Sequence, residues 1–95
     1  MSDPTLLVLA SLADGAKHGY AMMEDIERFA GIHLGPGTLY GAITRLEERG
    51  WIEPVATHDR RQPYTLSASG REHLKTQLGT LDRLLKTATR RLRHA

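Results

Sequence analysis

The chain has 95 residues, enough for one domain, and its 40% hydrophobic and 25% charged residues give the composition of a folded globular protein. It contains no cysteine, which excludes disulfides, thiolate metal sites and cysteine nucleophiles. The net charge of +2 is uneven, because residues 1–50 sum to −3 and residues 51–95 to +5. This asymmetry favours a polyanionic partner on one face, although a solvated basic face gives the same pattern.

The first predicted helix begins at Pro4, which suits the first helical position, after Asp3, which can cap the free N–H groups. The helix is apolar nearly all round and runs to about Ala13, so we expect it to lie in the core. No apolar stretch approaches the roughly 18 residues that span a bilayer. Residues 1–5 are acidic where a signal peptide would be basic, which indicates a cytoplasmic protein.

Two more helices are predicted over residues 19–30 and 36–49, because apolar residues recur there at helical spacing. The apolar positions of the first are Met22, Met23, Ile26, Phe29 and Ala30. Those of the second are Leu39, Ala42, Ile43 and Leu46. Gly50 ends the second helix in the position expected after a last turn.

A β-hairpin with a basic tip is predicted next. Residues 51–57 and 63–66 are rich in β-branched and aromatic side chains, and they flank the polar segment 58–62. Pro54 and Pro63 cannot donate to a ladder, so both belong at strand ends or on a sheet edge.

The last predicted helix runs from about Ala68 to His94, with Ser67 as its cap. An apolar seam follows it at alternating steps of four and three residues: Leu74, Leu78, Leu81, Leu85, Ala88 and Leu92. A helix of this length extends about 40 Å, beyond the small body, so a second surface must cover the seam. We therefore divide the chain into residues 1–67 and a C-terminal dimerisation helix, residues 68–95.

This order of elements predicts the fold class: mainly α with a small β-hairpin, a winged helix-turn-helix followed by a long C-terminal helix. The third helix of such a domain is narrow enough to enter a DNA major groove, while the hairpin, or wing, lies over an adjacent backbone or minor groove. One domain then holds the duplex at two places.

Several sequence segments carry a more specific signal, in this order: His18-Gly19-Tyr20, Pro36-Gly37-Thr38-Leu39-Tyr40, Arg45-Leu46-Glu47-Glu48-Arg49-Gly50-Trp51-Ile52, and Tyr64-Thr65-Leu66-Ser67 with Gly70. Together they resemble the PadR family of transcriptional regulators. The resemblance implies a homodimeric winged-helix repressor whose last helix pairs the subunits. It also implies a possible small aromatic effector that relieves DNA binding, as in some members.

The predicted DNA-binding residues are Tyr20, Gly37, Thr38, Tyr40, Gly41, Thr44, Arg45, Arg60 and Arg61. Arg45 can pair with guanine or a phosphate, and the helix N-terminus at Gly37 and Thr38 suits a phosphate. Arg60 and Arg61 can enter a narrow minor groove. The alternatives are a solvated helix face, a soluble loop tip and, for the two tyrosines, core rings with satisfied hydroxyls.

The predicted function is a sequence-specific DNA-binding regulator, acting as a homodimeric repressor with helix 36–49 in the major groove and wing 57–63 beside it. The alternative is a winged-helix protein-interaction module. Paired carboxylates, an arranged nucleophile and a glycine-rich phosphate loop are all missing, so we expect no enzyme and no cofactor. The histidines have no metal-ligand spacing, so we expect no metal: His18, His33, His58, His73 and His94.

Overall fold

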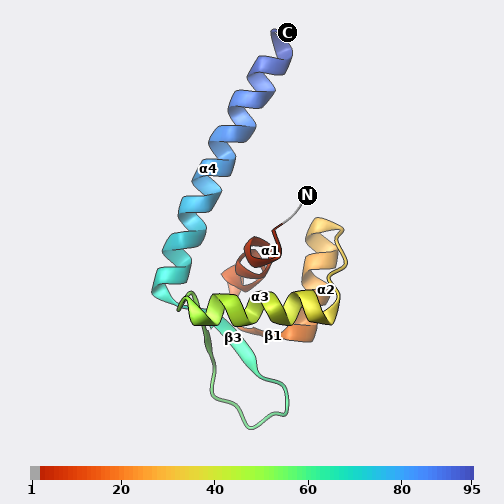
Figure 1. Ribbon diagram of the computed structural model, residues 1–95, viewed down its shortest axis with the longest axis vertical. Coiled ribbons are helices and arrows are strands. Elements are labelled where there is room, and N and C mark those ends of the chain that lie inside the picture. Colours follow the sequence, from red (N-terminus) through yellow and green to blue (C-terminus); the bar gives the residue numbers. More distant parts are fainter. Residues whose placement is uncertain (1–2) are drawn as a thin grey trace.

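The computed structural model describes residues 3–95 and has the predicted fold class, mostly helical with a small antiparallel sheet (Figure 1). The elements in chain order are α1 (Pro4–Ser11), a 3-10 turn (η1, Leu12–Asp14), β1 (Lys17–His18), α2 (Gly19–Ala30), α3 (Pro36–Glu48), β2 (Ile52–Pro54), β3 (Pro63–Leu66) and α4 (Ala68–Arg93). The free end of α4 and the loop between β2 and β3 point to opposite ends of the molecule.

Both predicted side-chain caps are present. The Asp3 carboxylate accepts hydrogen bonds from the Thr5 amide at 3.0 Å and the Thr5 hydroxyl at 2.7 Å, and Ser67 Oγ accepts from the Gly70 amide at 3.0 Å. The Thr5 hydroxyl lowers the pKa of the Asp3 carboxyl, and the positive charge of Arg45 adds to this effect. The first helix is shorter than predicted, because the chain tightens into the 3-10 turn after Ser11.

The sheet corrects the predicted hairpin in two respects. Its strand order is β1-β3-β2, so β3 pairs on one side with Lys17–His18, a strand that the sequence did not predict. A two-residue strand carries no alternating pattern, and only pairing with distant residues makes it one. The strand predicted over residues 51–57 is limited to Ile52–Pro54, since the chain opens into the wing loop after the bond from Val55 N to Pro63 O.

The core lies between the first three helices, the sheet and the first turns of α4. Its members are Val8, Leu9, Leu12, Met22, Ile26, Leu34, Leu39, Ala42, Ile43, Leu46, Ile52, Leu66 and Leu74. Phe29, one of the apolar positions of α2, has a ring that is 50% exposed. It shares a helix face with Met22 and Ile26, but the described elements leave this last turn of α2 half uncovered.

The start of α4 is fixed to the end of α3 by a compact joint, which we call the α3–α4 joint: Gly50, Trp51, Ser67, Gly70 and His73. The Trp51 and His73 rings stack with centroids 3.6 Å apart. The Ser67 amide donates to the Trp51 carbonyl at 3.0 Å, and the Ser67 hydroxyl donates to the Gly50 carbonyl. Gly70 packs directly against the Trp51 backbone.

Beyond this joint α4 leaves the body, and the molecule reaches 56 Å in its longest dimension (Figure 1). Leu74, predicted as part of the dimerisation seam, is 5% exposed and packs in the core of its own chain. The exposed leucines of α4 are Leu78, Leu81, Leu84, Leu85 and Leu92. Leu84 was not part of the predicted seam, although it is 62% exposed.

Candidate nucleic-acid interface

The outer side of α3 has small and polar residues. Gly37, Gly41, Thr44 and Glu48 follow one another at steps of three or four, so they share one side of the helix, opposite the buried leucines. Thr44 is exposed and Gly41 half-buried. Because glycines leave the helix backbone uncovered, this side can approach another surface more closely than a helix with long side chains.

The N-terminus of α3 is open. Gly35 occupies the cap position without a side-chain hydrogen bond, and Pro36 is the first helical residue. The N–H groups of Gly37 and Thr38 therefore have no side-chain cap, and both residues are exposed. Free N–H groups and the positive end of the helix dipole together favour an anion here.

Thr44 has a defined hydrogen-bonding role on this side of α3. Its hydroxyl donates to the Tyr40 carbonyl within the same helix, at 2.9 Å. The proton is thereby occupied, which leaves lone pairs and the methyl group for an incoming group. Thr44 can accept from a base amino group or contact a thymine methyl.

Arg45 and Tyr40 occupy opposite flanks of this surface. Arg45 is exposed on the flank nearest Asp3, and its guanidinium lies 3.5 Å from where a Cβ on Gly41 would be. The Tyr40 ring is 51% exposed, and its hydroxyl end lies over Gly19, where an added Cβ would come within 2.5 Å. Gly19 is thus needed for the position of Tyr40.

Tyr64 of β3 is half-buried and lies near Tyr40. Burial raises the pKa of the Tyr64 hydroxyl, and the nearby Glu47 and Tyr40 contribute in the same direction.

The wing approaches the start of α2. Arg61 Nη1 lies 3.5 Å from His18 Nε2, and the Arg61 guanidinium lies 5.9 Å from the centroid of the Tyr20 ring. Tyr20 is 54% exposed. Arg60, its neighbour in the loop, is also exposed. One continuous surface therefore extends from α3 across the start of α2 to the wing.

The free positive charge of this surface comes from arginines. Lys17 is engaged with the Asp14 carboxylate at 2.6 Å and with the Ser11 carbonyl, and its hydrogen bond and charge lower the pKa of Asp14. Within residues 3–95, by contrast, no carboxylate lies within 4.0 Å of Arg45, Arg60 or Arg61. These guanidinium groups remain available for an external anion.

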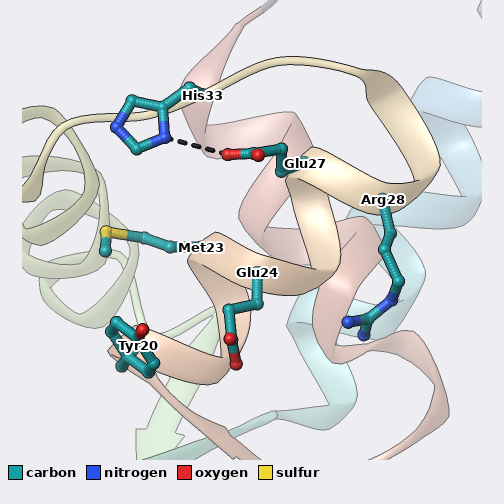
Figure 2. A pocket seen from close by; sticks show the side chains of 6 residues that line it. All are labelled: Tyr20, Met23, Glu24, Glu27, Arg28 and His33. Carbon is teal, nitrogen blue, oxygen red and sulfur yellow. Dashed lines mark hydrogen bonds and ion pairs between the residues drawn. The ribbon is translucent and has the colours of Figure 1, made fainter.

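A hollow of about 490 Å³ borders this surface beyond Tyr20 (Figure 2). Its lining comes from α2 and the link to α3: Tyr20, Met23, Glu24, Glu27, Arg28 and His33. Figure 2 shows His33 reaching back to Glu27, with Nδ1 and Oε1 2.9 Å apart. The wall of this hollow carries charges of both signs, from Glu24, Glu27 and Arg28.

Two other features are absent from the described part of the chain. No group of three or more histidine, aspartate or glutamate side chains in residues 3–95 could hold a metal ion. Over the same residues, no helix combines the length and apolar character that crossing a membrane requires.

Comparison with known proteins identifies the family. Residues 8–76 match the family model described as Transcriptional regulator PadR-like family. The chain belongs to this family. The PadR-like chain is also 43% identical over 83 residues to an uncharacterized 37.1 kDa protein in transposon TN4556 of Streptomyces fradiae. That match covers 87% of the chain and 24% of the relative, so the chain spans about a quarter of the relative's length.

Solved structures share the PadR-like fold. A PadR family transcription regulator from Clostridium difficile R20291 superposes with a TM-score of 0.85 at 20% identity, covering 94% of this chain and 97% of that one. A transcriptional regulator from Clostridium thermocellum gives a TM-score of 0.80 at 22% identity, covering 92% and 87%. The predicted family resemblance is thus confirmed.

The structure brings most of the predicted site residues of this PadR-like protein onto the continuous surface described above. Tyr20 and Tyr40, for which core positions were open, are both about half exposed. Sequence reasoning missed the approach of Arg61 to His18, which are 43 residues apart in the chain. No local pattern could have indicated it, because the pairing of β1 with β3 creates it.

Proposed function

We propose that this PadR-like regulator binds DNA sequence-specifically as a symmetric homodimer and represses transcription by excluding polymerase. One observation carries the proposal: the outer side of α3 is exposed, small and polar, and it adjoins a wing with unpaired arginines. Such a helix suits the major groove, where each base pair presents its own pattern of donors, acceptors and methyls. Wing residues 57–63 would then lie on the adjacent backbone or minor groove.

The same proposal assigns residues 1–67 to DNA binding and residues 68–95 to dimerisation. Its support is the row of exposed leucines on α4, which in a single chain face solvent. Two copies of α3 would occupy successive major grooves about 34 Å apart on an inverted repeat. A small aromatic effector would act by binding more tightly to a dimer in which the distance between the two α3 helices does not match the spacing of the grooves.

The deciding experiment is selection of bound sequences from random DNA, followed by affinity measurements over a range of salt concentrations. We expect the selection to recover an inverted repeat. We also expect log affinity to fall linearly with log salt concentration, with a slope of about 0.9 for each phosphate that the protein neutralises. The alternative function is a protein-interaction module, which the exposed α4 leucines also suit. Recovery of no common sequence, with salt-independent partner binding, would establish that alternative.

Arg61→Ala should reduce the slope of log affinity against log salt by about one per subunit, because a guanidinium on a phosphate releases about one counterion. Fluorescence anisotropy with the selected duplex measures this slope. The matched control is Arg83→Ala, which removes an exposed arginine on α4, far from the wing. Equal slopes for the wild-type protein and Arg61→Ala would remove Arg61 from the interface.

Arg45→Ala should leave the dimer intact and relax base preference at one position of each half-site. A bidentate arginine–guanine pair contributes about 1–3 kcal/mol of discrimination against the wrong base. Repeating the selection with the variant measures that preference directly. An unchanged preference, with only weaker overall binding, would limit Arg45 to a phosphate contact on the flank nearest Asp3.

A further inference from the structure

We infer that His18 and Arg61 form a phosphate-binding pair, in which two donors from different elements hold one phosphate group of the DNA backbone. This inference rests on the proposed DNA-binding function and adds a residue to it. His18 also caps α2, since its Nδ1 accepts a hydrogen bond from the Ala21 amide at 3.2 Å.

The cap determines which ring nitrogen carries the proton. A neutral imidazole has one N–H and one lone pair, and the lone pair on Nδ1 is needed for the Ala21 amide. The proton must therefore be on Nε2, which makes Nε2 a donor. The group opposite it, Arg61 Nη1, is also only a donor. With this tautomer, the 3.5 Å approach of Nε2 and Nη1 places two donors side by side.

Two donors in this arrangement can share one external acceptor. With Nε2 and Nη1 3.5 Å apart, a single oxygen can lie about 2.9 Å from each of them. The guanidinium carries an unpaired positive charge, so an anionic oxygen is favoured over a neutral one. Within the described residues the nearby Lys17 is already held by Asp14 and the Ser11 carbonyl, which leaves Arg61 as the charge that attracts the anion.

The sheet and the Tyr20 ring both place Arg61 close to His18. β1 and β3 pair with His18 opposite Pro63, so the wing returns to the sheet two residues after Arg61. The Arg61 guanidinium lies over the Tyr20 ring, 5.9 Å from its centroid, at the outer range of a cation–π contact. Because the donors come from the start of α2 and from the wing, one phosphate would connect these two parts of the DNA-binding surface.

Two variants of His18 separate phosphate binding from capping. His18→Asn places a carbonyl oxygen near the Nδ1 position and retains the cap, but it removes the Nε2 donor. His18→Gln places an amide donor near the Nε2 position and removes the cap. Binding to the duplex recovered by selection is measured by anisotropy, and thermal unfolding is measured alongside.

The expected result is that His18→Asn binds roughly tenfold more weakly with an unchanged Tm, as for loss of a hydrogen bond to a charged group. His18→Gln should bind within about twofold of the wild-type protein but unfold at a lower temperature. Equal losses of affinity in both variants, or a loss in His18→Gln alone, would overturn the phosphate-binding pair while leaving DNA binding established. Failure of the wild-type protein to bind any duplex would instead refute the proposed function itself.

A second readout locates the phosphate. Single phosphates of the selected duplex are replaced in turn by neutral methylphosphonates. In the wild-type protein, one methylphosphonate position per half-site should lower the affinity clearly. The same replacement should lower the affinity of His18→Asn and of Arg61→Ala much less, because each variant already lacks one partner of that phosphate. Losses that are the same in all three proteins at every position would exclude a shared phosphate.

Discussion

Gly70→Ala should destabilise the protein by about 3 kcal/mol, at the upper end of the usual cost of forcing extra volume into a packed site. A Cβ at this position would lie 1.8 Å from the Trp51 carbonyl oxygen and 2.7 Å from its carbonyl carbon. The clash is with backbone, and that backbone cannot move away freely. The Trp51 ring is stacked on His73, and its carbonyl accepts the Ser67 amide.

Thermal unfolding at a fixed protein concentration measures this effect, and a decrease in Tm of roughly 10–25 °C is expected for a domain of this size. Gly79→Ala is the matched control, because it makes the same substitution in the same helix. There the nearest atom to an added Cβ is the end of the Arg83 side chain at 3.9 Å, so better helix propensity should leave Tm unchanged or raise it. Equal Tm values for the two variants would contradict the close contact.

Leu85→Asp should convert the protein to a monomer and lower its affinity for the selected duplex by on the order of a hundredfold, because the second half-site contributes through avidity. In a single chain this leucine is 66% exposed, so a carboxylate there costs the folded monomer little. In a paired seam this carboxylate would be buried without a partner of opposite charge, which would strongly destabilise the dimer. Leu81→Asp should act in the same direction, although Leu81 also lines a groove beside Leu6 of α1.

Light scattering at micromolar concentration reports the mass, and anisotropy reports DNA binding. Thr87→Asp provides the control, since it introduces the same charge two residues along α4, on the other side of the helix. It should remain dimeric and bind DNA normally. A Leu85→Asp variant that keeps the dimeric mass would show that the exposed α4 leucines are not the subunit interface.

The elements that could be predicted from sequence are those that local chemistry determines. Apolar residues at helical spacing located α2 and α3, and the Asp3 and Ser67 side chains marked two helix starts, because a cap depends only on residues three positions away or fewer. β1 could not be predicted, since two residues become a strand only by pairing with Tyr64 and Pro63. The exposure of Phe29 depends in the same way on what covers the end of α2.

The candidate interface also combines features that local sequence determines with features that depend on distant contacts. The outward side of α3 could be predicted because helical spacing separates Thr44 and Arg45 from the buried positions. The position of Leu74 in the core could not, because its place in a regular leucine pattern does not reveal where α4 leaves the body. The contact between His18 and Arg61 depends on the fold of the wing, which no pattern within either segment encodes.

The contacts of the α3–α4 joint connect α4 directly to α3. With 26 residues, α4 is about 39 Å long, so a tilt of about 5° at its base displaces its far end by about 3 Å. Because Gly70 is in contact with the Trp51 backbone, we expect such a tilt to turn α3 together with α4 rather than to bend the connection. In a dimer of two such chains, a small change in the crossing angle of the two α4 helices would therefore change the angle at which each α3 helix meets the double helix.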